Sequence, residues 1–217
     1  MRKNVCFILV FLICFTCNIV WGKTFEKSIR NNGLINLENN ISDICFFDNN
    51  GVKVVYSSDK DLQEEKNIII EKIRQQNLEN VIEEVDNEIN VSNYKNEKIK
   101  VLLYKENNKT IVEEEIINYN SSKKLSELMQ ELTNLQTKYS KDLRYFQYIK
   151  GKINNKDSTI DKINSIREMK NINTLEIHNG YVGTANIYDG ERVNFSVCTY
   201  NTGSYLVIGT PIIFTTY

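Results

Sequence analysis

The side chains best suited to catalysis are few and lie far apart in the sequence. His178 is the single histidine, and it precedes Asn179-Gly180, a dipeptide that favours a tight hairpin turn. Cys198 could act as a nucleophile only if His178 reached it across the intervening strands, because a thiol needs a neighbouring base. No third residue at a suitable spacing would orient that base. We therefore interpret both residues as structural and predict no catalytic residues and no enzymatic activity.

Two acidic runs could in principle supply oxygen ligands for calcium. They are Glu83-Glu84 with Asp86, and Glu113-Glu114-Glu115. Neither has the glycine-punctuated spacing of a calcium-binding loop, and their strand-like context favours solvated faces. Residues 23–217 also lack the motifs CxxC, HExxH, GxSxG, Walker A and GxGxxG. We predict no metal ligands, no cofactor and no cofactor-binding residues.

One group of aromatic residues is interleaved with cations. Such rings can stack on sugars or bases, or they can pack a sheet against a helix. We favour packing, because aromatic residues in strands are ordinary core material. The aromatic residues are Tyr139, Tyr145, Phe146 and Tyr148, and the cations are Lys141, Arg144, Lys150 and Lys152.

Residues 1–22 have the pattern of a secretory signal peptide. A basic start at Met1–Asn4 is followed by an apolar run from Val5 to Phe15 that is short for a membrane span. Val20-Trp21-Gly22 favours cleavage after Gly22, although the apolar residues before it leave an uncleaved anchor as the alternative. We expect an extracytoplasmic protein, secreted or membrane-tethered, that contacts the membrane only through the leader if the leader is uncleaved.

Removing the leader changes both the charge and the cysteine content. Arg2 and Lys3 are lost, so acidic residues outnumber basic ones in the remainder, which argues against nucleic acid as a partner. Cys45 and Cys198 are the only cysteines left. They could form a disulfide outside the cytoplasm, but both lie in apolar runs, which favours two buried thiols.

Helical periodicity is clearest in three segments. The first follows Ser58-Asp59, with acidic residues in its first turn and apolar residues from Leu62 to Ile73. The second begins at Ser121 or Ser122 and extends to about Tyr139, and the third begins at Ser158. A shorter helix is expected at Thr24–Arg30.

Alternating or continuous apolar runs predict the strands. Several short strands are expected between Leu34 and Tyr56, with a turn at Asn49-Asn50-Gly51. The C-terminus is expected to form an antiparallel meander with turns at Asn179-Gly180 and Asp189-Gly190. The remaining predicted strands are Val81–Asn87, Lys98–Lys105, Lys109–Tyr119, Leu143–Ile153, Thr174–Ile177, Tyr181–Tyr188, Arg192–Tyr200 and Tyr205–Tyr217.

This order of elements predicts an α+β protein with two packed halves after the leader. Residues 23–140 form the N-terminal half and residues 141–217 the C-terminal half, each an antiparallel sheet with helices on one face. The similar order of elements suggests pseudo-duplication, although no repeat can be aligned residue by residue.

Three stretches resemble the YwmB family of Firmicutes, whose members are often labelled TATA-box-binding-like. They are the strand Tyr145–Ile153, the segment Gly180–Ala185 and the ending Ile208–Tyr217. The resemblance implies a secreted or membrane-tethered, two-part α+β protein of unknown biochemical role. It carries no catalytic residues over to this chain.

Together these features favour a non-catalytic extracytoplasmic protein of the cell envelope that binds a protein or a cell-wall polymer. The alternative is an envelope hydrolase with an unrecognised acidic site between the two halves. A cleft holding two carboxyl groups of raised pKa would favour the hydrolase, whereas an exposed apolar face would favour binding.

Overall fold

The computed structural model describes residues 33–76, 81–92, 96–119 and 123–214. These residues form four α-helices, one short 3-10 helix and ten strands of a single antiparallel sheet, so the expected mixture of helices and antiparallel strands is confirmed. The leader, its cleavage site after Gly22 and the helix expected at Thr24–Arg30 lie outside the described residues. Within the described ranges, no helix has the length and apolar character needed to span a membrane.

The same succession of elements occurs twice along the chain: a helix, a long strand, a second helix and four further strands. The first succession is α2 (Gly33–Ser42), β1 (Phe46–Ser58), α3 (Leu62–Gln75), β2 (Val81–Val85), β3 (Glu88–Ser92), β4 (Glu97–Glu106) and β5 (Lys109–Asn118). The second is α4 (Leu125–Leu135), β6 (Ser140–Lys152), α5 (Lys156–Ser165), β7 (Lys170–Ile177), β8 (Gly180–Asn186), β9 (Arg192–Tyr200) and β10 (Gly203–Thr210), with the 3-10 helix η1 (Tyr188–Gly190) before β9.

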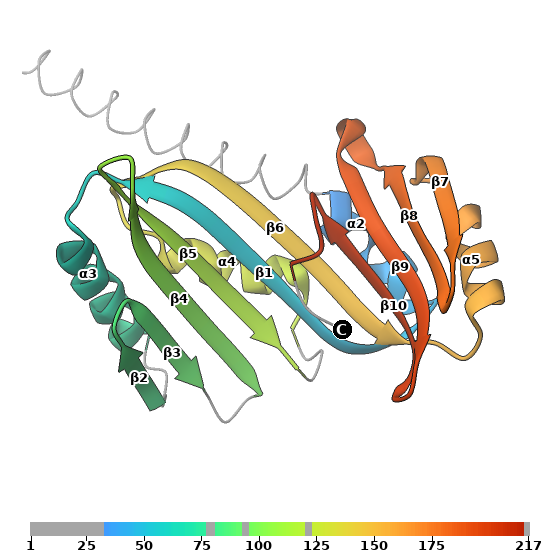
Figure 1. Ribbon diagram of the computed structural model, residues 1–217, viewed down its shortest axis with the longest axis horizontal. Helices are drawn as coiled ribbons and strands as arrows, with labels where there is room; N and C mark the ends of the chain where they lie inside the picture. The colour runs from blue at the N-terminus through green and yellow to red at the C-terminus, as the bar shows by residue number, and fades with distance from the viewer. Residues whose placement is uncertain (1–32, 77–80, 93–95, 120–122, 215–217) are drawn as a thin grey trace, which may run out of the picture.

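The two long strands β1 and β6 pair antiparallel at the centre of the sheet. Outward from this pair, the order is β5, β4, β3 and β2 on one side, and β10, β9, β8 and β7 on the other (Figure 1). We expected a sheet in each half, and the hydrogen bonds between β1 and β6 instead join all ten strands into one sheet. The order of strands is therefore the same on both sides of the central pair.

The helices lie on one side of this sheet (Figure 1). Alternate residues of β5 illustrate the effect, because Val112, Glu114 and Ile116 are buried towards the helices whereas their neighbours are only half-buried. Alternation of this kind is expected of a strand with one covered face. We call the other side the helix-free face.

The first helix of each succession packs across the centre of the sheet. Helix α2 contacts β6, and α4 contacts β1. The Glu38 carboxylate of α2 accepts a hydrogen bond from the Leu125 amide at the start of α4, at 3.0 Å. The Glu191 carboxylate accepts one from the Gly33 amide at the start of α2, at 2.9 Å. Because the first amides of a helix have no partner within it, these carboxylates cap α4 and α2 and link the first succession of elements to the second.

The strand expected around Leu34 is wrong, since this segment forms helix α2. Leu34, Leu37 and Ile41 have the three- and four-residue spacing of an amphipathic helix, and all three are completely buried. The short apolar runs on both sides obscure this spacing in the sequence.

The turn expected at Asn49-Asn50-Gly51 is also wrong, because β1 passes through it without a break. Asn50 is buried, and its amide donates to the Lys123 carbonyl at 2.9 Å and accepts from the Asn118 amide at 3.1 Å. At Gly51, an added Cβ would lie 2.6 Å from the Tyr148 ring. Both turn-forming residues are therefore required by tertiary contacts and not by a change of direction.

The C-terminal meander is confirmed, but its last strand is shorter than expected. Strand β10 ends at Thr210, and Pro211 follows it. Ile212 is 55% exposed, whereas Phe214 returns to the helix-free face, where its ring centroid lies 5.0 Å from that of Tyr148. The strands expected on either side of Asn107-Asn108 are confirmed as β4 and β5, and strand β3 is an addition to the predicted elements.

Candidate functional site

The structure does not join His178 and Cys198 through a hydrogen bond. His178 is exposed in the turn between β7 and β8, whereas Cys198 is buried on β9. The nearest acceptor recorded for the Cys198 thiol is the Tyr181 carbonyl at 3.8 Å. His178 and Cys198 therefore do not form a nucleophile and base pair in the part of the chain that is described.

The prediction of two buried thiols is confirmed, since neither Cys45 nor Cys198 is bridged. Cys45 packs against Gly151 on the helix-covered face, whereas Cys198 pairs with Tyr205 on the helix-free face. The sheet therefore separates the two sulfur atoms. Burial raises the pKa of the Cys45 thiol to about 12, so this thiol is poorly suited to nucleophilic attack.

The acidic runs do not assemble a metal site in the described ranges, where no group of three potential ligands occurs. Glu84 forms an ion pair with Lys66 at 3.2 Å, and Glu113 pairs with Lys53 on the helix-free face. The expectation that the second run is solvated is wrong for Glu114. Successive strand residues point to opposite faces, so Glu114 enters the helix-covered core while Glu113 and Glu115 remain on the other side.

Glu114 is completely buried, and its carboxyl group accepts a hydrogen bond from the Tyr56 hydroxyl at 2.9 Å. Desolvation raises the pKa of Glu114 to about 8, and the Tyr56 hydrogen bond opposes part of this rise. The second carboxyl oxygen of Glu114 has no hydrogen-bond partner among the described residues. Both observations fit a carboxyl group that keeps its proton at neutral pH.

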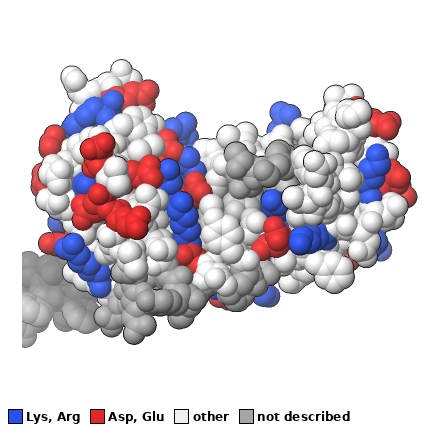
Figure 2. Space-filling model, turned by 60° about the horizontal axis from the view of Figure 1, so that its bottom comes forward, with Lys and Arg blue, Asp and Glu red and all other residues white. Residues whose placement is uncertain are grey.

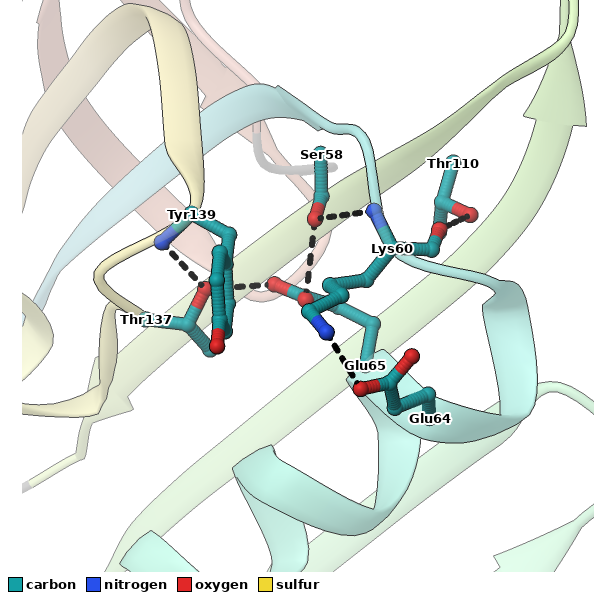
Figure 3. Close-up of polar contacts among 7 residues, drawn as sticks. All are labelled: Ser58, Lys60, Glu64, Glu65, Thr110, Thr137 and Tyr139. Atoms are coloured by element: carbon teal, nitrogen blue, oxygen red, sulfur yellow. Dashed lines mark hydrogen bonds and ion pairs between the residues drawn. The ribbon is translucent and has the colours of Figure 1, made fainter.

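A second buried carboxyl group, Glu65, lies at the start of α3 (Figure 3). It accepts hydrogen bonds from the Ser58 hydroxyl at 2.9 Å and from the Thr137 hydroxyl at 2.6 Å. Each hydroxyl oxygen also accepts a hydrogen bond from a backbone amide. The Lys60 amide donates to Ser58, and the Tyr139 amide donates to Thr137. Glu65 thereby links the end of β1, the start of α3 and the turn before β6.

The polar surroundings of Glu65 differ sharply from those of its neighbour Glu64. Glu64 points outward and forms an ion pair with Lys60 at 2.5 Å, and the Lys60 ammonium also lies 4.6 Å from the centre of the Tyr139 ring (Figure 3). Glu65 and Glu114 are both 0% exposed, so no substrate can reach them in this conformation. We assign the two buried carboxyl groups to the stability of the fold.

The sequence comparisons give no relative from which to transfer a site. No protein-family model matches the chain, and no curated protein matches it. The candidate site therefore has to be identified from the geometry of the protein itself.

The predicted aromatic group divides between the two faces of the sheet. Tyr145 faces the helices, and its hydroxyl bonds to the Gln136 side chain at 3.1 Å. Phe146 and Tyr148 lie on the helix-free face, where both contact the Phe214 ring edge to face. Tyr148 is completely buried by these contacts. The packing interpretation is therefore confirmed for these rings, with the C-terminal segment as an additional partner.

The helix-free face differs in charge between its two ends. Figure 2 shows charged side chains gathered over the end that contains β2 to β5, whereas the end that contains β7 to β9 is mostly uncharged. Cross-strand ion pairs account for part of the first pattern, including Lys53 with Glu113 and Lys100 with Glu88. The second end therefore offers a surface where few charges need to be desolvated on contact.

One groove of about 400 Å³ lies on this mostly uncharged end. Its volume lies within the range of small-molecule sites. Its lining is Asn173, Leu175, Val182, Gly183, Thr184, Arg192, Asn194, Phe195, Ser196 and Ile213. We take this groove as the candidate functional site.

A second groove of about 570 Å³ lies near the turn between β4 and β5. Its charged residues include Glu106, Lys109, Asp142 and Arg144. Asp142 already accepts a hydrogen bond from the Ser57 hydroxyl at 3.0 Å and lies 3.7 Å from the Lys109 ammonium. Its carboxylate is therefore partly neutralised by its own neighbours.

Sequence reasoning missed both the burial of Glu65 and Glu114 and the groove on β7 to β9. Glu65 is indistinguishable in the sequence from the other acidic residues of a first helical turn. The groove residues come from β7, β8, β9 and the C-terminal segment, and only the strand pairing brings them together. The signal available in the sequence was the low charge of the segment from Gly180 to Asn186, which contains no acidic or basic residue.

Proposed function

We propose that the protein is a non-catalytic extracytoplasmic protein of the cell envelope that binds a protein or a cell-wall polymer through the helix-free face. The observation that carries the proposal is the groove on β7 to β9, which is open to solvent and has no acidic residue in its lining, while the carboxyl groups of Glu65 and Glu114 are sealed from solvent. Export rests on the leader pattern of residues 1–22.

An envelope hydrolase has less support. General acid and base catalysis would require two carboxyl groups that reach a substrate. The carboxyl group with the strongly raised pKa, Glu114, is sealed beneath the helices and bonded to Tyr56. The carboxylates of the second groove face solvent beside Lys109 and Arg144, an arrangement typical of surface ion pairs.

We also propose that the two successions of elements are a pseudo-duplication of the YwmB-like, TATA-box-binding-like kind. The support is the identical order of elements in each succession and the matching order of strands outward from β1 and β6. In this arrangement the helix-free face is continuous across both halves, so a long ligand could contact all ten strands.

A co-sedimentation experiment tests the binding function. Residues 23–217 are mixed with insoluble cell-wall material and, separately, with immobilised envelope proteins. We expect retention by one of them, and we expect Leu175→Glu to lower it because Leu175 is 65% exposed on the helix-free face. Gln130→Glu adds the same charge at an exposed position of α4 and should not lower it.

Two results would contradict the proposal. Equal loss of retention in Leu175→Glu and Gln130→Glu would show that the helix-free face is not the contact surface. Steady release of soluble sugar or peptide fragments from the wall material by the purified protein would show a hydrolase.

A further inference from the structure

The groove lies over β8 and β9, which offer it side chains and no free backbone groups, and over β7, which forms an edge of the sheet. Strands β8 and β9 are paired on both sides, so their backbone hydrogen-bonding groups are already used within the sheet. An extended peptide could not add to them as a further strand, which is how sheets usually bind peptides. A ligand in this groove must be recognised by the side chains that project from the face.

Those side chains form two short rows across the strands. In one row, Asn173 lies opposite Thr184, which lies opposite Asn194. In the next row, Leu175 lies opposite Val182, which lies opposite Ser196. Directly opposed residues have Cβ atoms about 5 Å apart, so each row spans roughly the width of a sugar ring or two.

The polar members suit a ligand that both donates and accepts hydrogen bonds. An asparagine amide donates through its nitrogen and accepts through its oxygen, and a hydroxyl group does both. Asn194 also donates to the Pro211 carbonyl, which holds the C-terminal segment beside the groove and places Ile213 in its wall. The combination of amide, hydroxyl and aliphatic groups matches the alternating polar and apolar surfaces of a saccharide.

The groove carries one charge, the guanidinium of Arg192. This side chain is exposed, and among the described residues it has no carboxylate partner. No acidic residue contributes to the lining. A positive groove in a chain of formal net charge −1 therefore selects an anionic group, which a guanidinium can bind with two parallel hydrogen bonds.

We propose that this groove binds an acidic saccharide, with the sugar hydroxyl and amide groups on Asn173, Thr184 and Asn194 and the acidic oxygens on Arg192. The inference rests on the proposed binding function and narrows it to the wall-polymer class. The acidic group is a carboxylate or a phosphate ester, which share the oxygen geometry that a guanidinium recognises.

Calorimetric titration of residues 23–217 with three sugars tests the inference. N-acetylmuramic acid supplies a carboxylate, N-acetylglucosamine 6-phosphate supplies a phosphate, and N-acetylglucosamine is the neutral reference. We expect at least one acidic sugar to bind about tenfold more tightly than the neutral sugar, with the preference shrinking as salt is added. Which acidic sugar binds identifies the source of the anionic group.

Variants then locate the interaction. Arg192→Gln should reduce the affinity for the acidic sugar about tenfold, to that of the neutral one, while Arg192→Lys keeps part of the preference. Arg74→Gln removes the same charge from an exposed position on α3 and should change nothing. Asn194→Ala should lower the affinity for all three sugars. Circular dichroism confirms that each variant is folded.

The outcomes separate this inference from the proposed function. Equal affinity for the three sugars, or a preference that survives in Arg192→Gln, would overturn the inference. Retention on wall material without binding of any sugar would overturn it and leave the binding function standing. Retention by envelope proteins alone would replace the saccharide with a protein partner, and no retention by either material would remove the binding function as well.

Discussion

Replacing Glu65 with alanine should lower the free energy of unfolding by about 3 kcal/mol. Glu65 is completely buried, and it is the acceptor for the hydroxyl groups of Ser58 and Thr137. Its removal leaves two buried donors without that acceptor and opens a cavity between α3 and the sheet. Urea denaturation followed by circular dichroism measures the loss.

Glu64→Ala is the matched control, because it makes the same change one residue earlier on the same helix. The Glu64 side chain is 52% exposed and forms only an ion pair with Lys60, so its loss should cost less than about 0.5 kcal/mol. Similar losses in the two variants would show that Glu65 does not hold the end of β1 to the turn before β6.

Replacing Glu114 with glutamine should change how stability depends on pH. Burial raises the pKa of Glu114 to about 8 in the folded protein, from 4.5 for a glutamate in water. Between these values the unfolded chain releases a proton that the folded protein retains, so stability falls as pH rises through this window. The contribution is fully present below pH about 4.5 and lost above pH about 8.

Glutamine cannot titrate, yet its carbonyl can still accept the Tyr56 hydroxyl. The free energy of unfolding of Glu114→Gln, relative to the native sequence, should therefore increase by about 4 kcal/mol between pH 4.5 and pH 8. Denaturation series at several pH values measure this difference. A difference that stays constant with pH would contradict a protonated Glu114.

Tyr56→Phe provides an independent check on the same carboxyl group. The Tyr56 hydroxyl lowers the pKa of Glu114, because it donates a hydrogen bond that favours the charged form. Without it, the fall in stability with pH should continue to a higher pH than in the native sequence. A fall that ends at lower pH would show that the hydroxyl does not bond to the carboxylate as described.

Much of the fold follows from local patterns in the sequence. Apolar spacing predicts the helix from Leu62, and alternating apolar residues predict the strands on either side of Asn107-Asn108. The structure confirms both. The turn-forming glycines from Gly180 onward likewise predict the C-terminal meander. These signals are local, because each depends on residues within a few positions of one another.

The errors arise where distant residues override the local pattern. Asn50 and Gly51 favour a turn in the sequence. In the structure, the Asn118 amide donates a hydrogen bond to the Asn50 side chain, and the Tyr148 ring occupies the space next to Gly51. In the sequence, Glu65 has the pattern of an ordinary acidic residue in the first turn of a helix. Its burial depends on Thr137, which is distant in the sequence and donates a hydrogen bond to it. The groove likewise depends on the pairing of β7, β8 and β9, which the sequence of each strand does not specify.

The most direct test of the helix-free face as the binding surface is a map of amide chemical shifts. Isotope-labelled residues 23–217 are titrated with wall fragments solubilised by a muramidase. We expect the largest shifts at Leu175, Val182, Thr184 and Asn194, with little change along α3 and α4. Shifts confined to the helices, or spread over the second groove around Asp142 instead, would contradict the account.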